Sequence, residues 1–454
     1  MRKKRDMYID YRRSFKGMRK RGHKKSVIIL IIILLVFGFG TVTYLGVRSQ
    51  IFLKKDSKGK DIDSSKEEDL LAENEIAQGD QPSNQQTQHE LSPSTYPTTM
   101  PTPTGSVQEV LGTPIHKIDD QVPTKVKGIY VTAPIAGNGD LLHSLIDLAE
   151  KTELNAMVID VKDDQGRITY SMDSNMVKEI GAISNTIPNM EELINNLKEK
   201  NIYLIARIVA FKDPYLAEQK QELAIKNSDG SIYRDNNGEG WVNPYNTKVW
   251  DYLVEIASEA AKVGFDEIQF DYIRFSTGKG ISDADFGEEA KDKSKEEIIT
   301  EFTKYAYERI KPFGVYVSAD VYGAIISSAI DAGLVGQNYV EMAKYLDYIC
   351  PMIYPSHFGA GNYGIEHPDL EPYNIISKVL TASKEKLDQL PEDEHRAIVR
   401  PWLQDFTASW IDNYMEYGEE ELREQIEGVY SVGYEEWMLW NAGCKYSEEG
   451  LEPE

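Results

Sequence analysis

Eight short apolar segments recur along the chain from residue 125 onward, and stretches with helical periodicity separate them. The segments lie at 127–133, 155–163, 201–211, 266–275, 314–323, 346–355, 397–406 and 435–443. Apolar residues recur at helical spacing between them, for example within 141–152, 190–200, 247–263, 295–310 and 418–432. A strand followed by a helix, repeated eight times, is the pattern of parallel β/α units. It predicts an α/β protein in which eight strands close into a (β/α)8 TIM barrel.

The end of the chain departs from this repeat. Only CKYSEEGLEPE (444–454) follows the eighth strand, which is too short for a full closing helix. We therefore expect a barrel whose last helix is short or missing. A doubly wound open sheet is the alternative architecture for the same order of elements.

A different pattern marks residues 27–47, VIILIIILLVFGFGTVTYLGV, which contain no charge over 21 residues. This length is enough for a helix to cross a hydrocarbon core of about 30 Å. A buried helix of a soluble protein rarely lacks a polar face altogether. A cleaved signal peptide would have a shorter apolar region and a small-residue cleavage site. The segment therefore predicts one retained transmembrane helix, a signal-anchor.

The flanking composition predicts how the chain is organised around this anchor. Residues 1–26 are basic, and the positive-inside rule places them in the cytoplasm. Residues 48–123 are rich in Ser, Thr, Pro and Gln and read as a disordered linker, because they contain too few large apolar side chains for a core. Residues 124–454 form the barrel domain. We expect a single-pass protein of the cell membrane with its C-terminal domain outside.

Charge is divided unevenly along the chain. Residues 1–25 hold twelve Lys or Arg and two Asp, a net charge of +10, so the rest of the chain carries −34 of the total of −24. An acidic main body argues against nucleic acid as its partner and favours neutral or weakly charged partners over polyanions. The two cysteines, Cys350 and Cys444, exclude a disulfide scaffold and are expected to be free thiols. The sequence carries no signal for an oligomeric state.

Candidate chemistry lies at the carboxyl ends of the strands, where barrels of this kind place their active sites. Period-two alternation directs Gln269 and Asp271 of the fourth strand and Asp320 of the fifth strand toward the barrel axis. Other polar or aromatic residues on or just after the strands are Asp160, Arg207, Arg274, Tyr354, Arg400, Trp402, Trp437, Trp440 and Asn441. Acids, aromatic rings and amides on one rim suit a sugar, since rings stack on pyranoses and amides bond hydroxyls.

Two inward carboxylates on neighbouring strands predict glycoside hydrolysis. In this hypothesis Asp271 is the nucleophile, or the base if the enzyme inverts, and Asp320 protonates the leaving oxygen. The charge of Asp271 can raise the pKa of the acid. Asp160 and Arg207 position hydroxyls or tune the acids, Tyr354 and Trp440 shape sugar subsites, and the other rim residues contact substrate. The long stretch 276–294 is expected to form a lid or a subsite wall.

Several blocks of the chain resemble a known family. They are VIDVKDDQG (158–166), WVNPYNTKVWDYL (241–253), AAKVGFDEIQFDYIRFS (260–276), SADVYG (318–323) and CPMIYPSHF (350–358). They are similar to a bacterial family of predicted glycosyl hydrolases, formerly a domain of unknown function, within the TIM-barrel glycosidase superfamily. This resemblance implies the barrel and the absence of a cofactor. FDEIQFDYI is more distantly similar to the fourth-strand block of chitinases, but Ile273 occupies the position of their acid. Amylases and α-galactosidases, with an Asp nucleophile ending strand four, match Asp271 better.

Two other functions fit the same barrel. A metal-dependent hydrolase or deacetylase would need a ligand set such as His-x-His on strand one, which offers only Tyr130 and Thr132 near its end. We therefore expect no metal site. A non-catalytic barrel that binds carbohydrate or organises the envelope is the second alternative. Individual acids can also have a structural role. Asp163 and Asp164 can each be a helix cap or a salt-bridge partner.

Overall fold

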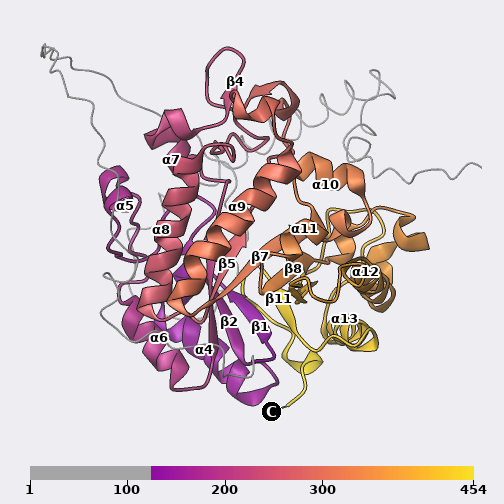
Figure 1. The fold of residues 1–454 in the computed structure, drawn as a ribbon. Helices are drawn as coiled ribbons and strands as arrows, with labels where there is room; N and C mark the ends of the chain where they lie inside the picture. The colour runs from indigo at the N-terminus through magenta and orange to yellow at the C-terminus, as the bar shows by residue number, and fades with distance from the viewer. Residues whose placement is uncertain (1–123, 454) are drawn as a thin grey trace, which may run out of the picture. The chain divides into compact units, whose positions relative to one another are not determined.

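The computed structural model describes residues 124–453, and at their centre eight parallel strands close into a barrel (Figure 1). The prediction of a (β/α)8 TIM barrel is confirmed, and each strand lies inside an apolar segment of the sequence. The seventh strand is split into β9 and β10. The strands are β1 (Lys127–Val131), β2 (Ala156–Lys162), β3 (Tyr203–Val209), β5 (Glu267–Asp271), β7 (Tyr316–Tyr322), β8 (Tyr348–Met352), β9 (Ile398–Val399), β10 (Trp402–Gln404) and β11 (Trp437–Trp440).

The barrel closes through the divided seventh strand. β9 pairs with β8, and β10 pairs with both β8 and β11, with Trp402 opposite Met352 and Met438. Pro401 lies between β9 and β10 and has no N–H to donate to a neighbouring strand, which explains the interruption. The closed topology rules out the open doubly wound sheet.

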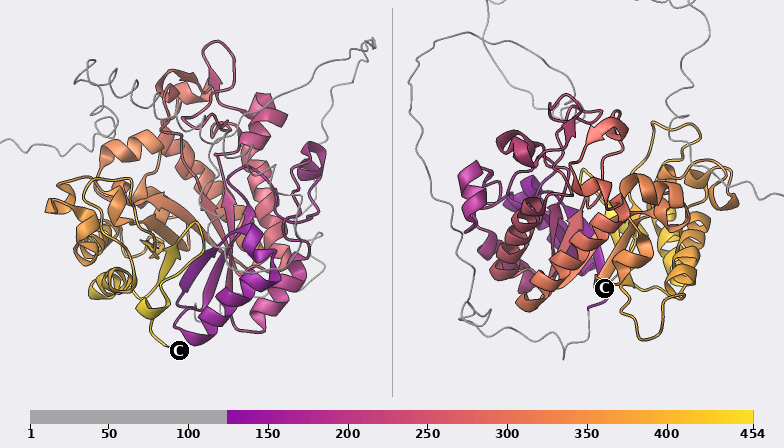
Figure 2. Two further views of the ribbon diagram at one scale, coloured as in Figure 1. Left: turned by 180° about the vertical axis from the view of Figure 1, so that it is seen from behind. Right: turned by 45° about the horizontal axis from the view of Figure 1, so that its top comes forward.

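Helices surround the strands, with α8 and α9 on one side of the barrel and α12 and α13 on another (Figures 1 and 2). The helix α8 begins after the N-cap Asn246 and ends at Gly264, whose φ of 117° suits glycine. The helix α9 begins with a capping box of Ser294 and Glu297. The helices are α3 (Ala133–Ala136), α4 (Gly139–Lys151), α5 (Asn175–Ile180), α6 (Met190–Lys198), α7 (Pro214–Gln219), α8 (Thr247–Val263), α9 (Lys295–Ile310), α10 (Ala329–Val335), α11 (Tyr339–Ala343), α12 (Pro372–Leu387) and α13 (Glu419–Ser431).

The end of the chain covers the flank that a closing helix would occupy. Only the 3₁₀ turn η11 (Glu448–Gly450) follows β11 in the described residues, as expected from the short sequence there. The Glu153 amide donates to the Glu452 carbonyl at 2.8 Å, and Pro453 forms an isolated bridge with Thr152. Arg423 of α13 joins the same flank by bonding Glu153 Oε1 at 2.7 Å. The last helix is therefore replaced by a tail that ties α13 to the end of α4.

Two long connections, after β3 and after β5, are joined above the rim. The short strand β4 (Lys226–Asn227) pairs antiparallel with β6 (Ala284–Asp285), at the top of Figure 1. The Asn243 amide also donates to the Phe286 carbonyl at 2.9 Å, and the Tyr245 hydroxyl to the Lys293 carbonyl at 3.0 Å. The stretch 276–294 is thus bonded to its neighbour as a wall beside the barrel mouth.

The predicted anchor at 27–47 and the linker at 48–123 lie outside the described residues. Within 124–453, no helix is both long enough and apolar enough to cross a membrane.

Candidate active site

Three strand ends meet at the guanidinium group of Arg207. Its Nη1 donates to Asp160 Oδ1 at 2.7 Å, while Nε and Nη2 donate to Asp271 Oδ2 at 3.0 and 2.6 Å. Strand register explains the meeting, because Asp160 of β2 lies opposite Arg207 of β3, and Val209 lies opposite Asp271 of β5. All three side chains are buried, with Arg207 only 1% exposed. The arginine therefore holds both carboxyl groups in place through charge-assisted hydrogen bonds.

A further acid reaches the same guanidinium from the loop after β2. Asp164 Oδ2 accepts from Nη1 and Nη2 of Arg207, each at 3.2 Å. Burial opposes the charged form of Asp164, but Arg207 and Lys212 outweigh it and lower the pKa of Asp164. Its neighbour Asp163 accepts two turn amides, those of Gln165 and Arg167. The two acids are thus a salt-bridge partner and a turn cap.

Tyr130 of β1 was missed as a site residue. Its hydroxyl donates to Asp160 Oδ2 at 2.7 Å, and its ring stacks on Trp440 of β11 with centroids 4.3 Å apart. Arg207 lies 5.4 Å from the Tyr130 ring centroid and 5.5 Å from that of Trp440. Burial raises the pKa of Tyr130, so the phenol stays a donor to Asp160. Its inward position near the end of strand one was the available signal.

Asp320 ends a neighbouring strand in a different environment. Phe270 of β5 pairs with Ala319 of β7, and Asp271 and Asp320 are the next residues on the two strands. Asp320 is 3% exposed, and its Oδ1 accepts a hydrogen bond of 2.7 Å from Trp402 Nε1. Burial, and then the charge of Asp271, raise the pKa of Asp320 well above its ordinary value. Asp320 is therefore suited to hold a proton next to a carboxyl group that is paired with an arginine.

The residue after Asp271 has an unusual backbone conformation. Tyr272 has a φ of 48°, in the left-handed region that tyrosine rarely adopts. Its amide donates to Asp271 Oδ1 at 2.6 Å, so both oxygens of Asp271 are held. The Tyr272 ring packs near the Lys212 ammonium at 5.0 Å and edge-on to Trp241 at 5.9 Å. Strain of this kind is characteristic of positions that fix functional geometry.

Three predicted substrate-binding residues lie away from this group and are corrected here. Arg400 is fully buried and ion-paired with Glu267 and Glu436, at the amino ends of β5 and β11, the opposite end of the barrel from Asp271. Gln269 is fully buried below Asp271, with its Nε2 3.5 Å from Cys350 Sγ. Trp437 begins β11 and donates to the Tyr430 hydroxyl of α13. A substrate at the rim has no access to these side chains.

The remaining predicted residues lie around the mouth. Trp402 is buried as the partner of Asp320, and Tyr354 is 7% exposed. The Arg274 guanidinium lies among rings, 4.7 Å from the centroid of Tyr322. Asn441 supports the loop after β10, since its amide donates to the Asp405 carbonyl. Contact between a substrate and these four residues stays a prediction.

The acids do not form a metal site in the described part of the chain. No group of three or more His, Cys, Asp or Glu within 124–453 has an arrangement that could hold a metal ion. Between Asp160, Asp164 and Asp271, the guanidinium of Arg207 takes the place that a cation would need.

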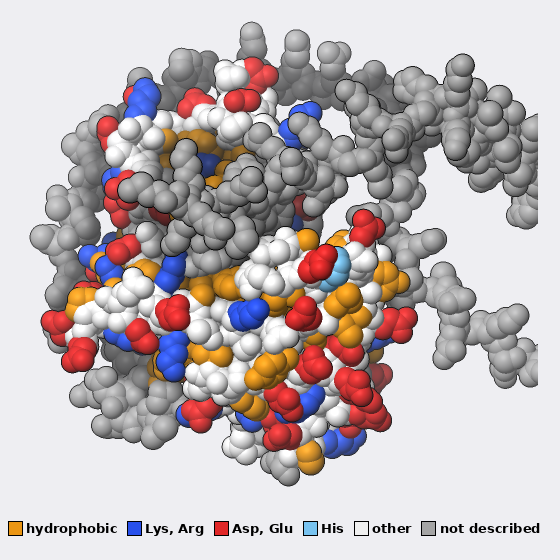
Figure 3. Space-filling model, turned by 90° about the vertical axis from the view of Figure 1, so that its right-hand side faces the viewer, with side chains coloured by type: hydrophobic (Ala, Val, Ile, Leu, Met, Phe, Trp, Pro, Cys, Tyr) orange, Lys and Arg blue, Asp and Glu red, His pale blue; other side chains and the backbone are white. Residues whose placement is uncertain are grey.

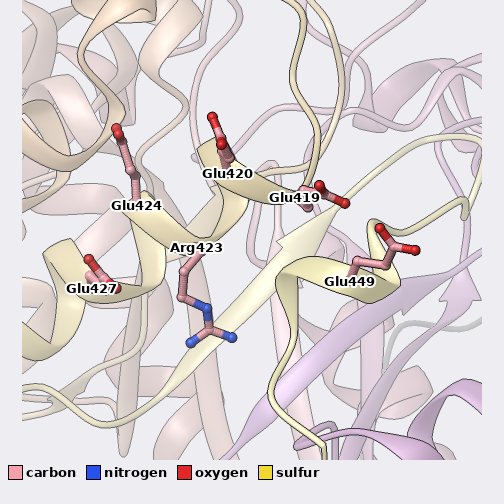
Figure 4. A pocket seen from close by; sticks show the side chains of 6 residues that line it. All are labelled: Glu419, Glu420, Arg423, Glu424, Glu427 and Glu449. Atoms are coloured by element: carbon pink, nitrogen blue, oxygen red, sulfur yellow. The ribbon is translucent and has the colours of Figure 1, made fainter.

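A shallow acidic pocket also lies on the flank of the barrel, away from the strand ends (Figure 4). Its walls are the solvent side of α13 and the turn η11. It is lined by Glu419, Glu420, Arg423, Glu424, Glu427 and Glu449. None of these residues contacts Asp271 or Asp320, so the pocket is separate from the candidate active site.

A closed parallel barrel with an arginine-paired aspartate and a second, buried aspartate at adjoining strand ends is the arrangement of a TIM-barrel enzyme of the glycosidase class. The family described as "Putative glycosyl hydrolase domain" matches residues 128–446, and the chain belongs to this family. Membership confirms both the family resemblance of the sequence blocks and the prediction of a glycosyl hydrolase.

A solved structure supports the fold, and a second is similar in sequence. The glycoside hydrolase domain of PgaB (BpsB) from Bordetella bronchiseptica has a TM-score of 0.51 at 13% identity, covering 73% of this chain and 99% of that domain. A hypothetical protein from Ruminiclostridium thermocellum ATCC 27405 is 44% identical over 42% of this chain and 97% of its own, with a TM-score of 0.40. No curated protein matches the chain significantly.

Proposed function

We propose that residues 124–454 hydrolyse O-glycosidic bonds of a polysaccharide or envelope glycan by two-carboxylate acid/base chemistry. Asp320 donates a proton to the leaving oxygen. Asp271 is the second carboxylate, which attacks the anomeric carbon in a retaining reaction or activates water in an inverting one. The proposal requires no cofactor.

The observation that carries the proposal is the contrast between the two aspartates. Asp271 is paired with Arg207, whose Nη2 lies 2.6 Å from Asp271 Oδ2. Asp320 is buried, receives one hydrogen bond from Trp402, and has a raised pKa. Two neighbouring carboxyl groups in different environments, one paired with an arginine and one buried with a raised pKa, are the arrangement that this chemistry needs.

The surrounding residues have supporting roles in the proposal. Arg207 fixes Asp271, and Asp160, held by Arg207 and Tyr130, is placed to accept a sugar hydroxyl. Burial raises the pKa of Asp160 against the effect of Arg207. The stacked rings of Tyr130 and Trp440, together with Tyr354, form apolar surfaces for a pyranose.

The test is release of reducing ends from a panel of envelope and storage polysaccharides. The wild-type chain is expected to act on a neutral or weakly charged glycan. Asp271→Asn and Asp320→Asn should each lower the rate by at least about 100-fold. Asp173→Asn, which changes an exposed acid, is the matched control and should retain the wild-type rate. Wild-type turnover by Asp271→Asn would remove that residue from the mechanism, and binding of glycan without any release would leave a carbohydrate-binding barrel.

The proposal also includes the location of the enzyme. We propose that residues 27–47 anchor the chain in the cell membrane, with the basic N-terminus in the cytoplasm and the barrel outside. This part rests on the uncharged 21-residue segment and the basic residues before it.

A further inference from the structure

A row of aromatic rings runs from the candidate acids to the surface on the β8 and β10 side of the mouth. It begins at Tyr354, which is 7% exposed. Tyr354 comes two residues after β8, whose Cys350 lies opposite Asp320 of the neighbouring strand β7. The Phe406 ring packs edge-on against Tyr354, with centroids 5.8 Å apart.

The row ends in a tryptophan that is open to solvent. Trp410 stacks on Phe406 at 6.0 Å with an interplanar angle of 16°, and Trp410 is 67% exposed. One face of the indole is therefore covered by Phe406, and the other face is available. A single exposed apolar side chain needs no explanation by itself. A flat one that continues a row of rings from a catalytic centre is different, because flat apolar surfaces stack on pyranose rings.

The loop that carries Trp410 is held in place at its other end. The Met415 amide donates to Asp369 Oδ2 at 3.2 Å, and the Tyr417 hydroxyl donates to the Asp369 carbonyl at 3.0 Å. The Tyr417 backbone amide donates to Thr407 Oγ1 at 3.0 Å, and this hydrogen bond joins the two ends of the loop. The indole is thus presented by a braced loop, and less ordering is needed when a ligand binds.

A polar group accompanies the rings. His357 is exposed, and its ring centroid lies 5.2 Å from that of Tyr354 and 6.3 Å from that of Phe406. Ser356 Oγ lies 3.0 Å from His357 Nδ1, and Nε2 has no hydrogen bond within the described residues. A ring nitrogen beside a stacking surface can bond a sugar hydroxyl.

We propose that the outer face of Trp410, with Phe406 behind it and His357 beside it, is a subsite for a further unit of a neutral sugar chain. The inference rests on the proposed function and adds that the enzyme selects chains over isolated glycosides. Phe406 contacts both Tyr354 and Trp410, so we place the sugar unit at Trp410 outside the one whose bond is cleaved. Asp412 and Glu416 are exposed on the same loop, and acidic side chains gather on the face that carries α12 and α13 (Figure 3). This charge disfavours a polyanionic chain.

The test is binding of the labelled full-length chain to a glycan array of neutral oligosaccharides with one to six hexose or N-acetylhexosamine units. Wild-type protein is expected to bind one series more tightly as its length increases. Trp410→Ala should weaken binding of the longer members by about 3- to 10-fold and leave the shortest unchanged. Trp410→Phe, which keeps an aromatic face, should restore most of the affinity. Tyr373→Ala removes an exposed aromatic on α12 outside the row and is the matched control.

Each outcome decides between the two proposals. Equal affinity of Trp410→Ala and wild type at every length, an equal loss at every length, or no binding of wild type to any neutral chain would overturn the subsite. Length-dependent binding that needs Trp410 but comes without hydrolysis would keep the subsite and remove the catalytic proposal. If Trp410→Ala hydrolyses chains of every length at the wild-type rate, the catalytic proposal stands and the subsite is removed.

Discussion

Asp271 and Asp320 are identical side chains whose surroundings at adjoining strand ends make them chemically different. Arg207 and the Tyr272 amide hold both oxygens of Asp271. Asp320 has one hydrogen bond from Trp402 and is otherwise buried near a negative charge. Burial raises the pKa of such an acid, so ionising it in the folded protein costs free energy. The raised pKa therefore affects the stability of the fold as well as catalysis.

Asp320→Asn is expected to stabilise the fold at neutral pH. The folded-state pKa of Asp320 is raised above its unfolded value near 3.8, so the stability that the protonated group contributes is complete below pH 3.8 and is lost as pH rises through the folded pKa. Asparagine keeps the shape and cannot ionise. Chemical unfolding at pH 7.5 should show a gain on the order of 1–3 kcal/mol that disappears near pH 3.5. A variant that is less stable than wild type at pH 7.5 would contradict the assignment of Asp320 as a buried neutral acid.

Trp402→Phe should shift the alkaline limb of the pH profile of kcat/KM to higher pH, by on the order of one pH unit. The indole N–H stabilises the ionised form of Asp320, so its removal raises the pKa of the acid further. Trp437→Phe also removes a buried indole, but one that bonds Tyr430, and should leave the limb in place. An unchanged or lowered limb in Trp402→Phe would show that another group supplies the proton.

At the scale of single residues, the sequence predicts which face of a strand a side chain occupies better than its position along the barrel axis. Alternation along strands identifies Asp271 and Asp320 as inward, and position on the strands adds Asp160 and Arg207. The structure brings Asp160, Arg207 and Asp271 together at one guanidinium. The same alternation also selects Arg400, which lies at the far end of the barrel, because periodicity states which face a residue occupies and not how far along the axis it sits.

At the level of elements, two long helices were predicted with their bounds, whereas another long helix and a non-local strand pairing were not predicted. α8 and α9 have the bounds of the predicted helical stretches, 247–263 and 295–310. The helix α12 was not among the stretches cited, although Ile375, Ile376 and Val379 have helical spacing. The two-residue pairing of β4 with β6 joins segments far apart in sequence, and no local pattern could predict it.

A buried ion pair between β2 and the connection after β3 is expected to stabilise the fold. Lys162 of β2 and Asp213, the N-cap of α7, are 2.9 Å apart and fully buried. Asp213→Ala should destabilise the protein by about 3–5 kcal/mol, because it leaves a lysine charge buried without its partner. Lys162→Met should cost less, because burial already raises the pKa of Asp213 and the lone acid can take up a proton. Urea unfolding of both variants measures the difference, and equal losses would contradict this account.

At the scale of the whole molecule, the acidic barrel domain follows a basic N-terminus and an uncharged segment. The full-length chain should sediment with membranes and resist extraction by high salt, whereas a chain lacking residues 1–47 should remain in the supernatant. Protease added to intact cells should degrade the barrel domain if it lies outside. Protection of the domain in intact cells and its digestion only after lysis would contradict the proposed orientation.

The account as a whole is tested most directly by the leaving-group dependence of Asp320→Asn and Asp271→Asn. Matched aryl glycosides of the sugar identified by the polysaccharide panel, with leaving phenols of low and high pKa, provide the substrates. If Asp320 is the proton donor, Asp320→Asn should lose about 100- to 10,000-fold with the poor leaving group and little with the good one, which needs no protonation. Asp271→Asn should lose activity on both. Equal losses in Asp320→Asn for the two leaving groups would contradict the assignment of the acid.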